Sequence, residues 1–239
     1  VYVGPPSLMY VDAGYAAFKT AKKDRQAMVY VGANDGMLHA FPVNSTGLGN
    51  ESWAFVPTAV MPKMFRMANT DYASRHQFSV DGTPAIGDIK VGSVWKTILV
   101  GGLNSGGNSI YALDITNPAS PALLWEFTDP DLGYTYGKPI ITKRANGTWV
   151  VVFASGYNNT GNGHLYVLNA NTGIQDVTKI STYTSGTTAA GSLTSPSGLA
   201  SLTAWVDSVT NNTAKRFYGG DLKGNVWRFD IDSVTPPHG

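Results

Sequence analysis

The chain contains 239 residues, of which 43% are hydrophobic and 14% are charged, and this composition predicts a globular protein with a substantial core. Its 17 basic and 16 acidic side chains nearly cancel, which excludes an overall field directed to nucleic acid or to an anionic membrane. The sequence contains no cysteine, so disulfides, thiolate metal sites and cysteine nucleophiles are excluded as well.

The chain opens VYVGPPSLMY, without an initiator methionine and without a basic-then-apolar leader. Its apolar runs all stay well below the roughly 20 residues that a membrane span needs. We therefore expect a soluble piece of a longer polypeptide, with no direct membrane span.

A strand-like run, a glycine or asparagine turn and a second, aromatic strand recur four times along the chain. The four copies read MVYVGANDGMLHAFP, ILVGGLNSGGNSIYALDI, VVFASGYNNTGNGHLYVLN and FYGGDLKGNVWRFDI. Alternation and turn residues of this kind are typical of β-hairpins. They predict equivalent strands at Val29 to Val31, Ile98 to Val100, Val150 to Phe153 and Arg216 to Tyr218.

Further strand-like runs flank these hairpins. NESWAFVP with Trp53 and ALLWEFTDP with Trp125 follow two of them, and DGTPAIGDI and YGKPIITKR precede two. Four strands per unit is the pattern of a propeller blade, and the two tryptophans are expected to pack between neighbouring blades. We predict an all-β fold, a modified and partial or irregular β-propeller, with residues 1–239 as a single domain or a fragment of one. The blade-like units are predicted at roughly 1–57, 80–128, 134–180 and 193–231.

Two segments favour short helices inserted between blades. The stretch PTAVMPKMFRMANTDYASRH, roughly residues 58–76, places Met61, Met64, Phe65 and Ala68 near one face of an α-helix. A second helix is predicted within YAAFKTAKKDRQ.

The polar side chains yield no catalytic candidate. A G-x-S-x-G elbow is absent from the sequence. Asp129 and Asp131 flank a proline in a turn where both can accept backbone amides, and Asp221 is expected to cap a tight turn. The four histidines lack the spacing of a metal site; they are His39, His76, His164 and His238.

The loop DSVTNNTAK places Asp207 first, Asn211 fifth and Lys215 ninth. Oxygen ligands on alternating residues allow a short loop to wrap a calcium ion. The spacing alone is compatible with a metal site, with a degenerate site or with a simple turn.

Taken in order, five motifs resemble the propeller of the PilC/PilY family of type IV pilus tip-associated proteins. They are DRQAMVYVGANDGMLHAF, VDGTPAIGDI, WKTILVGGLNSGGNSIYALDIT, LLWEFTDPDLGYTYGKP and FYGGDLKGNVWRFD, and the similarity runs from about Asp24 to Ile231. The resemblance implies a modified quinoprotein-type propeller that is exported to the periplasm, the outer membrane surface or the pilus tip of a bacterium.

The resemblance also implies a nine-residue calcium loop, D-x-D-x-[DN]-x-x-x-D, where Asp207 to Lys215 stands. Asp207 matches the first ligand, Asn211 matches the fifth, and Thr213 offers its backbone carbonyl, but Val209 and Lys215 replace the remaining carboxylates. Calcium prefers about six to eight oxygen ligands. We therefore expect a metal-free loop in which Asp207 pairs with Lys215, and no cofactor.

The family implies a non-enzymatic module of type IV pilus biogenesis and adhesion. Its expected partners are pilin or minor pilin subunits and a host or abiotic surface receptor. Two alternatives stay open: a quinone-dependent dehydrogenase-type propeller, suggested by LYVLNANTG, and a glycan-binding adhesin propeller with no role in pilus assembly. Against the first, the sequence shows no set of carboxylate, Asn and Arg side chains for the cofactor, and Val177 stands where a docking tryptophan is expected.

Overall fold

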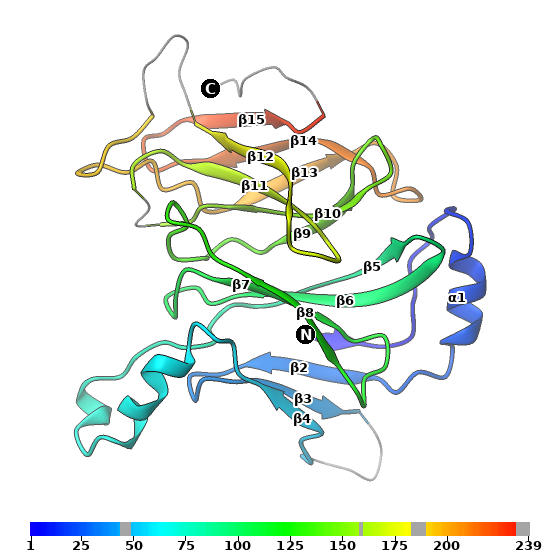
Figure 1. Ribbon diagram of the computed structural model, residues 1–239, viewed down its shortest axis with the longest axis horizontal. Helices are drawn as coiled ribbons and strands as arrows, with labels where there is room; N and C mark the ends of the chain where they lie inside the picture. The colour runs from blue at the N-terminus through cyan, green and yellow to red at the C-terminus, as the bar shows by residue number, and fades with distance from the viewer. Residues whose placement is uncertain (44–48, 158–159, 183–189, 233–239) are drawn as a thin grey trace.

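The fold is described by a computed structural model, which covers residues 1–43, 49–157, 160–182 and 190–232. Four antiparallel β-sheets are stacked one upon the next in chain order (Figure 1). Three sheets contain four strands each, in sequential order, and the last contains three described strands. The predicted all-β fold of blade-like sheets is therefore confirmed.

We number the sheets as blades 1 to 4. Blade 1 comprises β1 (Tyr2–Val3), β2 (Met28–Gly32), β3 (Leu38–Pro42) and β4 (Trp53–Phe55). Blade 2 comprises β5 (Ala85–Val91), β6 (Val94–Gly102), β7 (Ile110–Asp114) and β8 (Ala122–Phe127). Blade 3 comprises β9 (Ile140–Lys143), β10 (Trp149–Ala154), β11 (His164–Asn169) and β12 (Gln175–Ser181). Blade 4 comprises β13 (Leu202–Val206), β14 (Ala214–Gly220) and β15 (Val226–Asp230).

The second strand of every blade holds one of the four runs predicted to be equivalent, namely β2, β6, β10 and β14. Successive side chains of a strand point to opposite faces of its sheet, so each of these strands supplies side chains to two faces. In β10, Val150 and Val152 pack toward blade 4, whereas Val151 and Phe153 pack toward blade 2. Burial on both faces explains why the sequence of β10 is apolar throughout and does not alternate with polar residues.

The hydrophobic core is divided among the junctions between blades. Tyr30 and Leu99 belong to the cluster between blades 1 and 2, and Ile98 belongs to the cluster between blades 2 and 3. Val167 packs with Trp227 between blades 3 and 4. Each sheet is therefore stabilised mainly by the neighbours on which it is stacked.

Tryptophans in the outer strand of one blade bind a turn of the next blade. Nε1 of Trp53 donates to the carbonyl of Pro118 at 2.8 Å, and Nε1 of Trp125 donates to the carbonyl of Ala170 at 3.0 Å. Both carbonyls lie between the third and fourth strands of the following blade. The Trp125 ring also lies against Gly173, whose φ is +70° and where a Cβ would come within 2.6 Å of the indole. The predicted packing between blades is confirmed.

Val177 occupies the corresponding position in blade 3. The register that pairs Ala112 with Trp125 pairs Val167 with Val177. Val177 packs against the core between blades 3 and 4. The third junction is thus closed by an aliphatic contact in place of an indole hydrogen bond.

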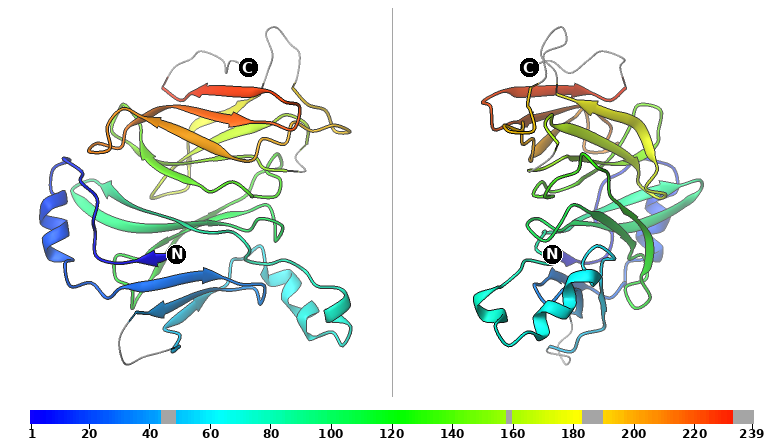
Figure 2. Two further views of the ribbon diagram at one scale, coloured as in Figure 1. Left: turned by 180° about the vertical axis from the view of Figure 1, so that it is seen from behind. Right: turned by 60° about the vertical axis from the view of Figure 1, so that its left-hand side comes forward.

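The helices lie on opposite sides of the stack. Helix α1 (Tyr15–Ala21) lies on one side, and the insertion with η1 (Met61–Ala68) and η2 (Tyr72–Ser74) projects from the other (Figure 2). Both predicted helical segments are therefore present, but only the insertion with η1 and η2 stands between blades, because α1 connects β1 to β2 within blade 1. None of the helices in the described part of the chain has the length and apolar character that crossing a membrane requires.

The insertion differs from the prediction in the type of its helix. Because η1 is a 3₁₀ helix with about three residues per turn, Met61, Met64 and Met67 fall into one row. The α-helical spacing had grouped Phe65 with Met61 and Met64. Instead, Met64 packs against Gly36 of blade 1, while Phe65 is 67% exposed.

Candidate functional site

The loop that resembles a calcium site connects β13 to β14. A carboxylate oxygen of Asp207 lies 3.8 Å from Nζ of Lys215, and both side chains are more than half exposed. The pair expected from the sequence is therefore present.

The other two candidate ligands are engaged within the loop. Oδ1 of Asn211 accepts the Thr213 amide at 2.9 Å, and the Thr213 carbonyl accepts the Asp207 amide at 3.4 Å. Asp207 is the only carboxylate between residues 207 and 215, so the donor set does not fit an ion that takes about six to eight oxygens. Among the described residues, which exclude His238, no three acidic or histidine side chains are grouped to hold a metal.

Asn212, which sequence reasoning passed over, fixes this loop to blade 3. Its carbonyl accepts the Lys143 amide at 2.9 Å and the Thr142 hydroxyl at 2.7 Å. Its Nδ2 donates to the Tyr10 hydroxyl at 3.0 Å and to the Ile141 carbonyl at 3.1 Å. The φ of Asn212 is +50°, a conformation that asparagine tolerates better than most residues. The sequence signal for this anchor was the pair Asn211 and Asn212, because asparagine is favoured in turns and tolerates a positive φ.

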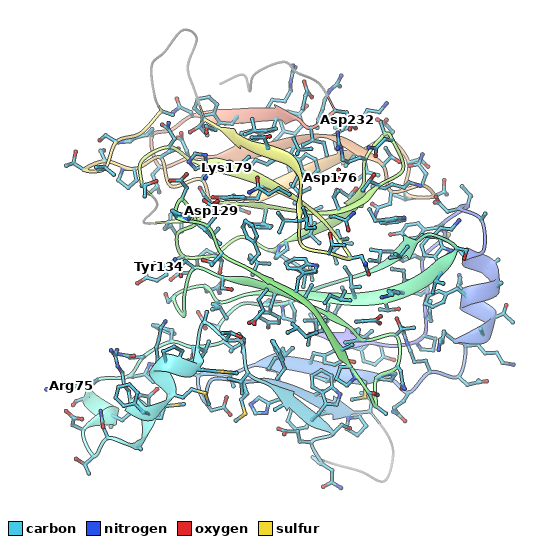
Figure 3. All side chains as sticks on the ribbon, viewed as in Figure 1. Arg75, Asp129, Tyr134, Asp176, Lys179 and Asp232 are labelled. Carbon is cyan, nitrogen blue, oxygen red and sulfur yellow. The ribbon has the colours of Figure 1, made fainter. Side chains whose placement is uncertain are left out.

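A second polar cluster lies between the β8–β9 connection and the outer strands of blade 3 (Figure 3). Nζ of Lys179 lies 2.8 Å from Oδ1 of Asp129 and 2.6 Å from Oδ2 of Asp131. Asp129 also accepts the Asp131 amide and the Tyr166 hydroxyl, each at 2.9 Å. The predicted hydrogen bond from a backbone amide is thus present for Asp129. Asp131 instead accepts hydrogen bonds from the side chains of Lys179 and Thr160. Sequence reasoning missed Lys179, which is 50 residues distant from Asp129.

Both carboxylates of this cluster are stabilised in their ionised form. Burial by itself would raise the pKa of Asp129, but hydrogen bonds from Lys179, the Asp131 amide and Tyr166 outweigh it and place the pKa below its usual value. Hydrogen bonds from Lys179 and Thr160 lower the pKa of Asp131. The cluster therefore acts as an ionic link between the β8–β9 connection and blade 3.

His164 borders the cluster without completing a catalytic triad. Its Nδ1 lies 2.8 Å from the Ser181 hydroxyl, and its Nε2 lies 3.7 Å from Oδ2 of Asp131. Burial lowers the pKa of His164, although the charge of Asp131 opposes this. A triad needs a carboxylate that orients and stabilises the imidazolium, and here Lys179 holds that carboxylate at the shorter distance of 2.6 Å.

His39 bridges two carboxylates in blade 1. Its Nδ1 lies 2.5 Å from Oε2 of Glu51, and its Nε2 lies 2.8 Å from Oδ2 of Asp35. Burial would lower the pKa of His39, but the hydrogen bonds and charges of both carboxylates outweigh it and raise the pKa. Because the two ring nitrogens point to different carboxylates, these three groups do not converge on one ion.

Asp221 caps the β14–β15 turn, as predicted. Its Oδ1 accepts the amides of Lys223 and Asn225, each at 2.9 Å, and its Oδ2 accepts Nε1 of Trp227 at 2.8 Å. Gly224 has a φ of +85°, which glycine adopts without steric cost. The role of Asp221 is structural.

The connections between the second and third strands of the blades gather at one end of the stack, which we call the hairpin end. It contains segments 33–37, 103–109, 155–157 and 221–225. The insertion with η1 and η2 projects on the same side (Figure 1).

Hydrogen bonds make the hairpin end continuous across the blades. Nζ of Lys63 in η1 donates to the Gly106 carbonyl of blade 2 at 2.6 Å. The Tyr134 amide, which follows blade 2, donates to the Tyr157 carbonyl of blade 3 at 2.7 Å. The Leu222 amide of blade 4 donates at 2.8 Å to a carbonyl of the β12–β13 connection. The loops thus form one surface.

Large apolar side chains are exposed along this surface. Phe65 is 67% exposed, Tyr134 is 40% exposed and Leu222 is 65% exposed, and Tyr134 points away from the sheets (Figure 3). Single exposed apolar residues are ordinary, whereas contiguous apolar patches occur at interaction sites. Phe78, Tyr136 and Leu193 are also exposed.

Comparisons with known proteins agree with the fold. The family model described as the PilY1 beta-propeller domain matches residues 3–236. The crystal structure of the Pseudomonas aeruginosa PilY1 C-terminal domain aligns with a TM-score of 0.78 and 36% identity, covering 97% of this chain and 45% of that chain.

Two curated relatives show similar identity. The type IV pilus biogenesis factor PilY1 of Pseudomonas aeruginosa strain PAO1 is 40% identical over 222 residues, which cover 91% of this chain and 18% of the relative. A PilY1 homolog of Xylella fastidiosa strain Temecula1 is 40% identical over 243 residues, which cover 96% of this chain and 18% of the relative. The chain spans less than a fifth of the length of these relatives.

Proposed function

Because the chain belongs to the family of PilY1 β-propeller domains, we propose that it is a non-enzymatic module of type IV pilus biogenesis and adhesion. The relatives named above are type IV pilus biogenesis factors, and the chain corresponds to a small part of each. The proposed location is the pilus tip, the outer membrane surface or the periplasm of a bacterium.

The observation that carries the proposal is the continuous hairpin end with its exposed apolar side chains. Phe65, Tyr134 and Leu222 come from different segments, yet hydrogen bonds hold those segments in one surface. Aromatic side chains with a polar tip are favoured in protein interfaces. We assign this surface to a pilin or minor pilin subunit of the pilus machinery, or to the receptor on the surface to which the bacterium attaches.

A non-enzymatic role is supported by the polar clusters. The carboxylates of Asp129 and Asp131 are engaged by Lys179, and Asp221 is engaged by its own turn. Because their pKa values lie below the usual range, Asp129 and Asp131 stay ionised near neutral pH and have no proton to donate as a general acid.

The test is a variant with Phe65→Ser, Tyr134→Ser and Leu222→Ser, expressed from the chromosome of the source bacterium. We expect fewer surface pili or weaker attachment, with a melting temperature of the purified chain within about 2 °C of the unmodified protein because these side chains are exposed.

The matched control changes three exposed aliphatic side chains at the opposite end of the blades. Val94 is the first residue of β6, and Ile174 and Val209 lie in the β11–β12 and β13–β14 connections. These side chains are 58%, 69% and 71% exposed. Serine at these positions should leave piliation and attachment unchanged. Normal piliation, twitching and attachment in the hairpin-end variant would count against the proposal, and binding to a glycan array without any effect on piliation would favour a glycan-binding adhesin.

We propose separately that the loop between β13 and β14 works without calcium. Lys215 supplies a positive charge to Asp207 at 3.8 Å, and Asn212 anchors the loop to blade 3 through its own hydrogen bonds. The loop therefore has a partner for its carboxylate and an attachment that needs no ion.

Calorimetric titration should show calcium binding no tighter than about millimolar, and chelators should leave the melting temperature unchanged. The double variant Val209→Asp with Lys215→Asp should recreate three carboxylates beside Asn211, and calcium should stabilise it by about 2.7 kcal/mol at a hundredfold excess over Kd. Each single variant should respond weakly. Micromolar binding by the unmodified protein would contradict this proposal.

A further inference from the structure

A pocket with a volume of about 410 Å³, which we call the turn pocket, lies at the junction of blades 2 and 3. It is lined by the β5–β6, β9–β10 and β11–β12 connections and by the strand residues that adjoin them. These connections lie at the end of the blades opposite the hairpin end, because neighbouring strands are antiparallel. The volume falls within the roughly 300–1,000 Å³ that is typical of small-molecule sites.

Three asparagines of the turn pocket have carboxamides whose orientation is fixed by hydrogen bonds to Oδ1. Oδ1 of Asn146 accepts the Thr148 amide at 2.9 Å. Oδ1 of Asn169 accepts the Asn171 amide at 3.0 Å, and Oδ1 of Asn171 accepts Nζ of Lys96 at 3.3 Å. Backbone amides and an ammonium group can only donate, so the oxygen of each carboxamide must occupy that position.

The nitrogen of each of these carboxamides is left available as a donor. Within the described ranges, the Nδ2 atoms of Asn146, Asn169 and Asn171 donate no hydrogen bond to the protein. Each Nδ2 carries two N–H groups. The described residues that line the turn pocket include no aspartate or glutamate that could accept from them. The pocket is therefore rich in donors and offers acceptor atoms of a ligand several partners.

Lys90 adds a positive charge to the same lining. It is partly buried, and its ammonium forms no ion pair or hydrogen bond with any residue that the structure describes. Lys96 differs from it, because Nζ of Lys96 lies 3.2 Å from a carboxylate oxygen of Asp114. The charge of Lys90 is thus uncompensated beside a set of N–H donors, and this combination suits an oxyanion.

The size and polarity of the turn pocket restrict the ligand further. A single inorganic anion is much smaller than about 410 Å³. An apolar ligand would find little surface to cover, because Ile89 and Trp149 in the lining are 0% and 5% exposed. A small molecule with one anionic group and several hydroxyl oxygens matches the charge, the donors and the volume together.

We propose that the turn pocket binds an acidic sugar. Its carboxylate or phosphate group pairs with Lys90, and its hydroxyl oxygens accept hydrogen bonds from the asparagine Nδ2 groups. The inference does not depend on the proposed pilus function, because these side chains lie away from the hairpin end.

The test is an NMR titration of the purified chain with D-galacturonate, D-glucose 6-phosphate, D-galactose and inorganic phosphate. The side-chain amide signals of Asn146, Asn169 and Asn171 report on the site. We expect at least one acidic sugar to shift them with a Kd of about 1 mM or tighter, and we expect galactose and inorganic phosphate to bind about tenfold more weakly or less. The acidic sugar that binds identifies the anionic group as a carboxylate or a phosphate.

Asn146→Asp tests the donors without removing the turn, since a carboxylate oxygen can still accept the Thr148 amide. We expect a melting temperature within about 2 °C of the unmodified protein, and binding of the acidic sugar weakened at least tenfold. The matched control is Asn117→Asp in the β7–β8 connection, where Oδ1 accepts the Ala119 amide at 3.3 Å outside the pocket. This control should bind as the unmodified protein does.

Lys90→Gln tests the charge. It should abolish the preference for the acidic sugar over galactose, whereas Lys23→Gln, at an exposed lysine outside the pocket, should preserve that preference. The proposal would be overturned if neither acidic sugar shifts the asparagine signals at about 10 mM. Equal binding of galactose or inorganic phosphate by the unmodified protein would also overturn it, and so would undiminished binding by Asn146→Asp.

Discussion

Replacing Lys179 with methionine should destabilise the protein, because it leaves two partly buried carboxylates without their cation. The side chains of Asp129 and Asp131 are 14% and 27% exposed. Hydrogen bonds to charged groups contribute about 1.5–3 kcal/mol each, and breaking a fully buried pair costs about 3–5 kcal/mol. Because all three side chains keep some contact with water and methionine retains the apolar stem, we expect a loss of about 2–4 kcal/mol.

Urea unfolding measures this loss as a lower midpoint at an unchanged m-value. The folded pKa values of Asp129 and Asp131 are lowered, so their contribution to stability is present above the unfolded pKa of about 3.9 and is lost as the pH falls through the folded values. The difference in unfolding free energy between the unmodified protein and Lys179→Met should therefore be full near neutral pH and close progressively below about pH 3.9.

The matched control is Lys23→Met, which removes an exposed lysine 4.0 Å from Asp24 and should change stability by less than about 0.5 kcal/mol. Adding Asp129→Asn and Asp131→Asn to Lys179→Met should recover part of the loss, because the uncompensated charges are then gone. A loss below about 1 kcal/mol, or one that does not depend on pH, would refute the account of this cluster as an ionic link.

Three further predictions follow from the structure. Trp125→Ala should cost about 3–5 kcal/mol in urea unfolding, because the side chain is 6% exposed and bonded to the next blade, whereas Trp205→Ala in the isolated chain should cost less than about 1 kcal/mol; equal losses would contradict the assigned burial. His39 has a raised pKa, so His39→Gln should cost stability at about pH 5 and have little effect once the pH rises above the folded pKa; a loss that grows with pH would reverse this reasoning. Asn212→Ala should be less stable than Asn212→Gly by about 1 kcal/mol, because φ is +50°; the opposite order would show that the backbone conformation is unimportant.

The β-hairpins could be predicted from the sequence because their signals are local. Alternating apolar side chains and turn residues at Gly36, Gly224 and Asn225 specify a hairpin within about fifteen residues. The packing of Trp53 and Trp125 between blades could also be predicted, since large aromatic side chains bury much area and dominate such contacts.

The polar links could not be predicted, because their partners are distant in sequence. Lys179 is 50 residues from Asp129, and Lys143 is 131 residues from Asp12, with which it pairs at 2.5 Å. No local pattern marks such pairs until the stacking of the sheets is known. The 3₁₀ form of η1 was missed for another reason. Met61 and Met64 are three residues apart, and this spacing places them on one face in a 3₁₀ helix and in an α-helix alike.

Stacking also determines where this protein can bind other molecules. A sheet enclosed on both sides uses its two faces for stability, as Val150 and Val151 show by packing toward opposite neighbours. Only strand edges, loops and insertions then stay free for partners. The exposed side chains of Phe65 and Tyr134 at the hairpin end contribute little to the core, so they can change without unfolding the blades. We therefore assign partners to the hairpin end, and we assign the enclosed faces of the blades to the stability of the fold.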